Sequence, residues 1–159
     1  MKILLVCYSQ GGTTQGHMDR LKDDLAAERM VTIRAKRPYT GVFGAARAGR
    51  EALFGRAAIE PPDLPPDMSA YDLVVLGAPV WAGRVAAPMR AFIQQYGQGM
   101  KRCAYVITHN AADAYEKVLD QLDGLTGVTR CASLSIGAPD KDVNARREAF
   151  VKNISEALP

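Results

Sequence analysis

The chain has 159 residues, 48% of them hydrophobic, and a formal net charge of +3 at pH 7. This length predicts one domain, spanning residues 1–159, with a real apolar core, and the charge is too weak to indicate a nucleic-acid-binding protein. No apolar run approaches the roughly 18 residues of a membrane helix, and the apolar start at residues 1–7 is too short for a signal peptide. We therefore expect a cytoplasmic protein without a membrane span.

In chain order, the sequence predicts a strand at 2–8, a helix at 14–28, a strand at 30–37, a helix at 41–54, a strand at 72–78, a helix at 87–96, a strand at 102–108, a helix that begins after residue 110, a strand at 129–136 and a helix at 142–158. These predictions rest on apolar periodicity, which alternates between strand-like and helix-like patterns along the chain. Five strands separated by helices predict an α/β fold of three layers, in which helices cover both faces of a parallel sheet.

Apolar residues at helical spacing mark the packing faces of these helices. The helix at 41–54 has as its apolar positions Phe43, Ala46, Leu53 and Phe54. The next-to-last helix, which we expect Asn110 to cap, has a core face made of Tyr115, Val118, Leu119 and Leu122. The last helix is expected to turn inward Val143, Phe150, Val151, Ile154 and Leu158. The three cysteines, Cys7, Cys103 and Cys131, lie far apart in apolar runs, so we expect reduced, buried thiols.

The pattern of apolar and polar residues in each strand predicts the order of the strands in the sheet. The first, third and fourth strands carry continuous apolar runs, which are typical of strands buried on both faces. The second and fifth show more polar alternation, so we expect them at the edges. This predicts a doubly wound, five-stranded parallel sheet of order 2-1-3-4-5, in which ligands bind beyond the carboxyl ends of the strands where the winding reverses. The loops after strands one, three and four are therefore the candidate site.

The loop after the first strand consists of Ser9, Gln10, Gly11, Gly12, Thr13 and Thr14. It combines hydroxyls and glycines with a helix start, whose free backbone N–H groups attract an anion. It contains no lysine, and the chain lacks the glycine-rich motifs for nucleoside triphosphates and dinucleotides. A phosphate monoester held by neutral donors therefore fits better, and an ordinary polar turn that caps a helix is the alternative interpretation.

The loop after the third strand contains Pro79, Val80, Trp81, Ala82 and Gly83, and Trp81 is the only tryptophan of the chain. An indole at the predicted crevice offers a flat face to a flat heteroaromatic ligand; alternatively, it simply covers the end of the sheet. The loop after the fourth strand begins with Thr108, His109 and Asn110.

Two segments carry a resemblance to a known family. Residues 8–14 resemble the phosphate loop of flavodoxins, and residues 71–83, continuing through Pro88, Met89, Arg90 and Phe92, resemble the third-strand segment of the flavodoxin-like family. The resemblance implies one bound FMN, with its phosphate held by the loop at 9–14 and its isoalloxazine ring flanked by the loop at 79–83. It further implies that residues 108–110 lie at the other face of the ring, although they lack the glycine or aromatic residues common there.

The resemblance implies an FMN-binding electron-transfer protein that exchanges electrons with a redox partner protein. An alternative is an FMN-dependent NAD(P)H:quinone-type reductase, in which His109 would donate a proton; another is a scaffold without cofactor that serves as a partner-binding module. Between residues 34 and 56, only Glu51 opposes a run of basic residues, namely Arg34, Lys36, Arg37, Arg47, Arg50 and Arg56. This charge favours an acidic partner or an anionic substrate, and a solvated face is the simpler interpretation.

Overall fold

The structure is a computed structural model of the chain that describes residues 1–54, 57–65, 67–111 and 115–158. The elements in chain order are β1 (Ile3–Cys7), α1 (Thr13–Asp24), β2 (Arg29–Thr32), α2 (Gly41–Phe54), β3 (Leu73–Trp81), β4 (Arg84–Val85), α3 (Ala87–Tyr96), β5 (Cys103–Thr108), α4 (Glu116–Thr126), β6 (Arg130–Ile136) and α5 (Val143–Ala157). Five of the strands form a parallel sheet of order β2-β1-β3-β5-β6, and β4 pairs only with β3. The predicted order of the five parallel strands is confirmed.

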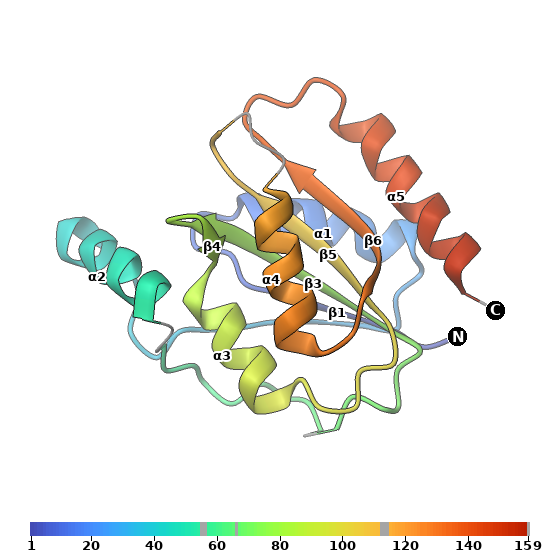
Figure 1. The fold of residues 1–159 in the computed structure, drawn as a ribbon, viewed down its shortest axis with the longest axis horizontal. Coiled ribbons are helices and arrows are strands. Elements are labelled where there is room, and N and C mark those ends of the chain that lie inside the picture. The colour runs from blue at the N-terminus through green and yellow to red at the C-terminus, as the bar shows by residue number, and fades with distance from the viewer. Residues whose placement is uncertain (55–56, 66, 112–114, 159) are drawn as a thin grey trace.

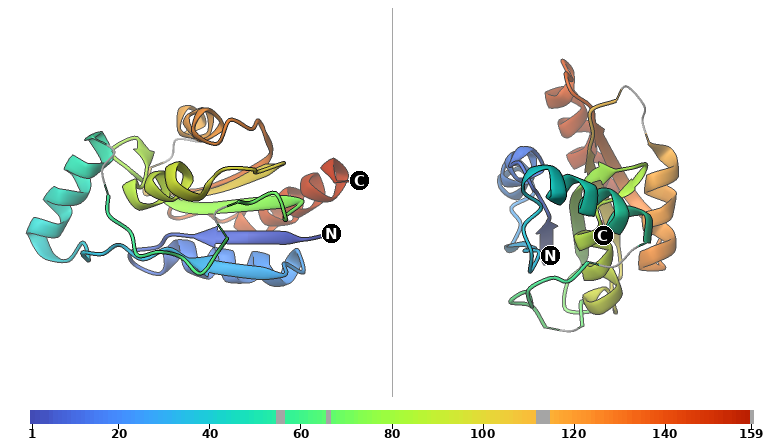
Figure 2. Two further views of the ribbon diagram at one scale, coloured as in Figure 1. Left: turned by 90° about the horizontal axis from the view of Figure 1, so that it is seen from below. Right: turned by 90° about the vertical axis from the view of Figure 1, so that its left-hand side faces the viewer.

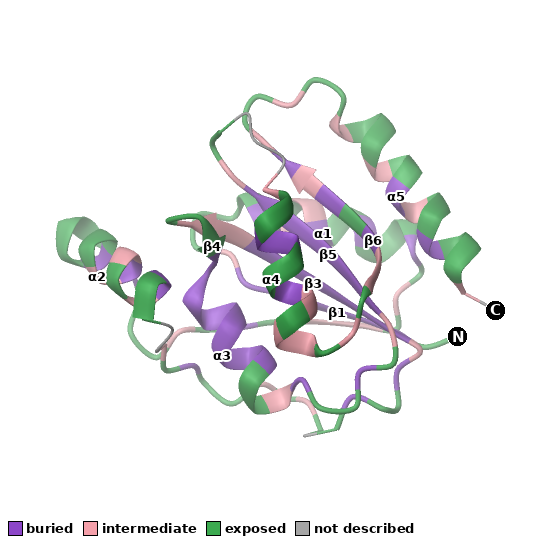
Figure 3. Cartoon of the chain, viewed as in Figure 1, coloured by how far each residue is buried: buried purple, intermediate pink, exposed green. Residues whose placement is uncertain are grey.

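Continuous apolar strands lie in the middle of the sheet because helices cover both of its faces (Figures 2 and 3). Every residue of β1 and β5 is buried. Successive side chains of β1 point to opposite faces: Leu5 joins the core cluster beneath α1 and α5, whereas Leu4 joins the cluster beneath α3 and α4. The edge strand β6 shows the alternating burial that its polar pattern predicts.

The third strand differs from the prediction at its carboxyl end. The sequence predicts an end at residue 78, whereas β3 continues to Trp81 and turns back into β4, a strand that the sequence analysis missed. Pairing of β3 with β5 ends at Pro79, after which β3 pairs with β4 instead. Ala82 and Gly83 have φ values of 48° and 72°, the backbone conformation of a two-residue turn between antiparallel strands. Trp81 therefore lies on a hairpin and not in a loop.

The predicted bounds of α2 are confirmed, but its large apolar residues do not pack. All four expected apolar positions are exposed, with Phe43 92% and Phe54 73% accessible to solvent. The helix packs through smaller residues of one face, namely Gly44, Ala48 and Ala52. The apolar periodicity of this helix thus predicted its existence correctly and its buried face wrongly.

Close backbone contacts explain why α2 packs through small residues. A Cβ added at Gly44 would lie 2.5 Å from the carbonyl carbon of Tyr39. From α3, the guanidinium of Arg90 donates hydrogen bonds to the carbonyl oxygens of Glu51, at 2.8 Å, and Ala52. Because α2 lies beyond the carboxyl edge of the sheet, against α3 and the β3–β4 hairpin (Figures 1 and 2), its outer face points away from the described core.

Several predicted bounds are wrong by a few residues, each for a local reason. Asn110 does not cap α4, which begins at Glu116 after Tyr115, a residue with a φ of 52°; residues 112–114, which the prediction placed inside this helix, lie outside the described part. The second strand ends at Thr32, because the chain then leaves the sheet and Ala35 bridges to residue 59. The first helix ends at Asp24, shortly before the positive φ of residue 26.

The residues predicted to face inward on α4 and α5 are partly buried and partly half-buried. Of the predicted inward residues, the buried ones are Val118, Leu119, Leu122, Phe150 and Ile154, and the half-buried ones are Tyr115, Val143, Val151 and Leu158. All three cysteines are free thiols, as expected, but Cys131 is only half-buried. None of the helices in the described ranges has the length and apolarity needed to cross a membrane.

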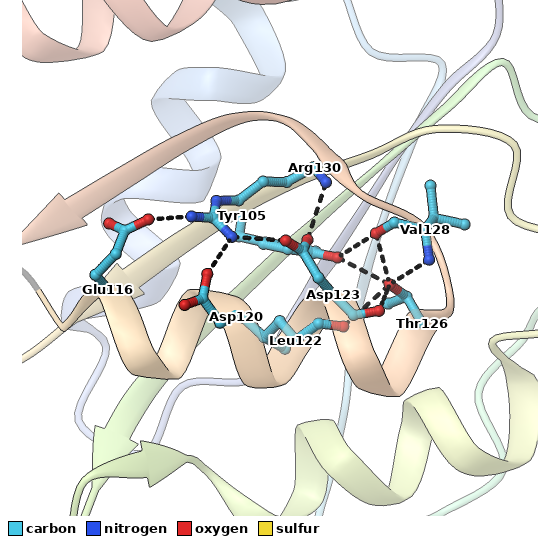
Figure 4. A network of polar contacts seen from close by, with 8 residues as sticks. All are labelled: Tyr105, Glu116, Asp120, Leu122, Asp123, Thr126, Val128 and Arg130. Atoms are coloured by element: carbon cyan, nitrogen blue, oxygen red, sulfur yellow. Dashed lines mark hydrogen bonds and ion pairs between the residues drawn. The ribbon is translucent and has the colours of Figure 1, made fainter.

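A polar network fixes α4 to the edge strand β6 (Figure 4). The guanidinium of Arg130 contacts three carboxylates of α4: Asp123 at 2.6 Å, Asp120 at 3.0 Å, and Glu116. Asp123 also accepts a hydrogen bond from the backbone N–H of Arg130 at 2.9 Å. The side chain of Asp123 is 22% exposed, whereas that of Asp120 is 66% exposed. Because Asp123 is more buried than Asp120, we expect its ion pair with Arg130 to contribute more to stability.

We expect Asp123→Ala to lower the free energy of unfolding by about 1.5–3 kcal/mol, because it removes charge-assisted hydrogen bonds from a half-buried guanidinium. The matched change Asp120→Ala, on the same helix and to the same arginine, should cost less than about 1 kcal/mol, since an exposed ion pair is screened by solvent. Urea unfolding of both variants gives the comparison. Equal losses would contradict the ranking by burial.

Candidate functional site

A cavity of about 680 Å³ opens at the carboxyl edge of the sheet, a size typical of small-molecule sites. Its walls come from the segments that follow β1, β5 and β6 and from the end of β3. The predicted site residues that line it are Ser9, Gln10, Gly11, Thr13, Thr14, Pro79, Val80, Trp81, Thr108, His109 and Asn110. Three predicted residues do not line it: Gly12, which directly precedes α1, and Ala82 and Gly83, which form the hairpin turn.

The loop after β1 has the backbone geometry of an anion site. Gly12 adopts a φ of 87°, which favours glycine, and its N–H donates to the Ser9 hydroxyl at 3.0 Å. The first backbone bond inside α1 runs from the N–H of Gly16 to the carbonyl of Gly12 at 3.0 Å. The amides of Thr13 and Thr14 precede that bond, so they remain free of helical partners and are available to an anion.

Two hydrogen bonds hold this loop against the rest of the cavity. The buried hydroxyls of Thr14 and Thr108 lie 2.7 Å apart, which ties the start of α1 to the end of β5. The side-chain amide of Gln10 donates to the carbonyl oxygen of Tyr39 at 2.5 Å. The loop is therefore anchored on both sides before any ligand arrives.

Two tyrosines hold the indole of Trp81. The ring centroids of Tyr8 and Tyr39 lie 5.5 and 5.0 Å from the indole, both in edge-on geometry. Tyr39 is itself fixed, because its hydroxyl donates to the carboxylate of Glu51 and the guanidinium of Arg47 lies 4.5 Å from its ring centroid. Packing on these sides orients the indole, while Trp81 also forms part of the cavity wall.

The phenols around Trp81 stay neutral at physiological pH. Burial, followed by the charge of Glu51, raises the pKa of Tyr8 to about 12. Burial and the hydrogen bond to Glu51 also raise the pKa of Tyr39. At the end of β1, burial and the nearby Asp19 raise the pKa of the Cys7 thiol to about 12. A reactive thiolate is thus disfavoured beside the cavity.

His109 links two loops of the cavity. Its Nδ1 lies 2.8 Å from the carbonyl oxygen of Ala111, and its Nε2 lies 2.8 Å from the hydroxyl of Ser135. A carbonyl oxygen only accepts, so Nδ1 donates its proton to Ala111, while Nε2 shares a hydrogen bond with the Ser135 hydroxyl. With both ring nitrogens engaged, this histidine fits a structural role better than that of a proton donor.

One wall of the cavity and one cavity residue of α1 are absent from the sequence prediction. The missed lining residues are His17, Ile136, Gly137, Ala138, Pro139, Asp140 and Val143. The predicted strand order already implied that the segment after the last strand lies near the site, because the carboxyl end of that strand is at the same edge of the sheet. His17 lies one helical turn after Thr13, so the predicted helix start also pointed to it.

The sequence matches no protein-family model and no curated protein, whereas solved structures resemble the fold. A flavoprotein from Lactobacillus acidophilus NCFM in complex with FMN superimposes with a TM-score of 0.71 at 18% identity, covering 91% of this chain and 97% of that one. A protein from Bacteroides uniformis ATCC 8492 gives 0.76 at 18% identity and covers 97% of both chains. The flavodoxin of Streptococcus pneumonia TIGR4 gives 0.63 at 13% identity, covering 99% and 100%. The chain therefore has the flavodoxin-like fold.

Proposed function

We propose that residues 1–159 form a single FMN-binding domain that transfers electrons. The main support for this function is that one cavity of about 680 Å³ joins an anion-accepting helix start to a wall that contains Trp81. These features suit the two ends of FMN, a phosphate and a flat ring. The complex of the Lactobacillus acidophilus flavoprotein with FMN, on the same fold, supports this assignment.

The predicted site residues divide into a phosphate end and a ring end. The phosphate would be held by the first loop, in which Ser9, Gln10, Gly11, Thr13 and Thr14 line the cavity. Gly12 would shape the loop through its positive φ and its hydrogen bond to Ser9. The ring would lie against the end of β3, where Pro79, Val80 and Trp81 line the cavity. Ala82 and Gly83 would contribute only from the adjoining hairpin turn, outside the cavity lining. Its other face would meet Thr108, His109 and Asn110.

Bound FMN would supply the electron-transfer chemistry, and the chain would bind and orient it. The Thr14–Thr108 bond fixes the phosphate end relative to β5, and the tyrosines fix Trp81 at the ring end. Such preorganisation lowers the entropy cost of binding.

The experiment that tests the function is a titration of FMN with the purified chain, followed by flavin fluorescence and absorbance. We expect quenching that saturates at one FMN per chain. Absence of binding at micromolar concentrations, with a folded chain by circular dichroism, would overturn both redox functions. The remaining hypothesis would then be that the chain is a scaffold without cofactor that binds a partner protein.

A second candidate function is that of an FMN-dependent NAD(P)H:quinone-type reductase. A second hollow of about 620 Å³ adjoins the cavity and shares with it His109 and the segment 137–140, leaving room for another ligand. The NAD(P)H:quinone oxidoreductase of Methanothermobacter marburgensis has a related fold, with a TM-score of 0.53 at 11% identity. Steady oxidation of NADH or NADPH in the presence of a quinone would support this function; no turnover with either nucleotide would remove it.

We also propose an acidic redox partner and a cytoplasmic location. Arg34, Lys36, Arg37 and Arg50 are exposed, on α2 and the segment that precedes it, and α2 packs against the hairpin that carries Trp81. Their charge would attract an acidic surface toward the ring end of the cavity. Of the two remaining basic residues of this group, Arg47 is half-buried against the ring of Tyr39, and Arg56 lies outside the described part. The free thiols suit a reducing compartment.

A further inference from the structure

The anion-accepting end of the cavity has no permanent cation in its described lining. Neither lysine nor arginine is among those residues, and the titratable side chains there are His17, His109 and Asp140. Both nitrogens of His109 are already bonded, and Asp140 pairs with Arg146 at 2.5 Å. His17 is thus the side chain left to oppose the charge of a phosphate.

The position of His17 on α1 suits that role. The helix begins at Thr13, so His17 lies one turn further along the same face. Helical side chains lean toward the amino terminus, and this direction carries the imidazole over the turn formed by Thr13 and Thr14. The half-buried ring lines the cavity together with both threonines.

Two arginines, Arg20 and Arg147, lie close enough to His17 to affect its protonation. Arg20 lies one turn further along α1, and Arg147 approaches from α5, where it pairs with Asp24 at 2.8 Å. Burial, then Arg20 and Arg147, lower the pKa of His17 from its ordinary 6.5, and Asp140 opposes them weakly. The lowered pKa favours the neutral imidazole at pH 7 in the free protein.

We propose that His17 is the cationic ligand of a phosphate monoester in this cavity and takes up one proton from solvent as the phosphate binds. The inference rests on the proposed function, since FMN is the phosphate monoester assigned to the site. No covalent bond changes: the solvent proton converts the imidazole into an imidazolium that donates a charge-assisted hydrogen bond to a phosphate oxygen.

Proton uptake makes the affinity depend on pH in a defined direction. A group whose pKa is higher in the complex than in the free protein gains a proton on binding, so affinity increases as the pH falls through the pKa of the complex. Phosphate itself keeps most of its second charge above its pKa of about 6. We therefore expect the Kd for FMN to fall about tenfold between about pH 8.5 and pH 6.5, because each unit of pKa shift corresponds to a factor of about ten.

The test compares FMN with riboflavin, which lacks the phosphate, on the full chain over this pH range. His17→Gln should flatten the pH profile for FMN, weaken its binding about tenfold at the low end, and leave riboflavin unchanged. Lys22→Gln is the matched control, because Lys22 is an exposed cation on another face of α1, and its profile should equal the wild type. An FMN profile unaltered by His17→Gln would overturn the inference while leaving FMN binding intact.

A second readout separates this inference from the proposed function. The chain has only two histidines, so the imidazole proton resonances of His17 can be identified in NMR spectra by comparison with His17→Gln. Excess inorganic phosphate, as well as FMN, should raise the pH at which these resonances titrate. If neither flavin binds, the proposed function fails; the His17 inference then stands or falls on the shift with inorganic phosphate.

Discussion

Trp81→Ala is expected to weaken FMN binding by about 1–3 kcal/mol, the scale of stacking on an aromatic side chain. The indole forms part of the cavity wall, and Tyr8 and Tyr39 hold it from other sides. Its removal takes away contact area for the ring and also loosens the two tyrosines. The loss should appear in the Kd for FMN and for riboflavin alike, because the change is at the ring end.

Trp81→Phe is the matched control for this prediction. A phenyl ring keeps an aromatic face at the end of β3, so most of the affinity should return. Circular dichroism and urea unfolding of both variants establish that the chain still folds. Unchanged FMN affinity in a folded Trp81→Ala protein would show that the indole only covers the end of the sheet.

Phe150→Ala is expected to lower the free energy of unfolding by about 3–5 kcal/mol, because it leaves a cavity in a packed core. Phe150 is 1% exposed and belongs to the core cluster between α5 and the sheet. Phe43→Ala is the same chemical change on α2, where the side chain is 92% exposed, and should alter stability by no more than about 0.5 kcal/mol.

Urea unfolding of the two variants measures the contrast directly, provided that both keep the slope of the wild type. A large loss from Phe43→Ala would show that α2 buries its apolar face in solution, for instance against a second copy, which concentration-dependent sedimentation would detect. A small loss from Phe150→Ala would place α5 away from the sheet.

The strand order was predictable because the burial of a strand determines which residue types it can contain. A strand covered on both faces excludes polar side chains, so runs such as 3–6 and 73–76 identify the middle of the sheet. The order in turn located three of the loops that line the cavity. Helix bounds were predictable where a local signal existed, as at 87–96, where a proline stands in the first turn.

The buried face of α2 was not predictable, because periodicity shows that one face of a helix is apolar and not what that face meets. The neighbouring backbone of Tyr39 lies so close to Gly44 that only a small residue fits there. Similarly, the length of β3 depends on its pairing partners, since the strand extends beyond the end of β5 and there pairs with β4. No pattern in the neighbouring residues of the sequence indicates either contact.

By itself, then, the sequence determined the class of fold, the order of the strands and the loops that carry the phosphate-type and aromatic features. These properties follow from hydrophobic patterning and from turn chemistry, which act over a few residues. Sequence signals pointed toward His17 and the segment 136–140, but only the tertiary structure decided that they line the cavity. It alone also decided that His109 is engaged at both nitrogens and that the apolar face of α2 points outward. Those outcomes depend on distances between residues far apart in the chain, which the packing of the whole domain sets.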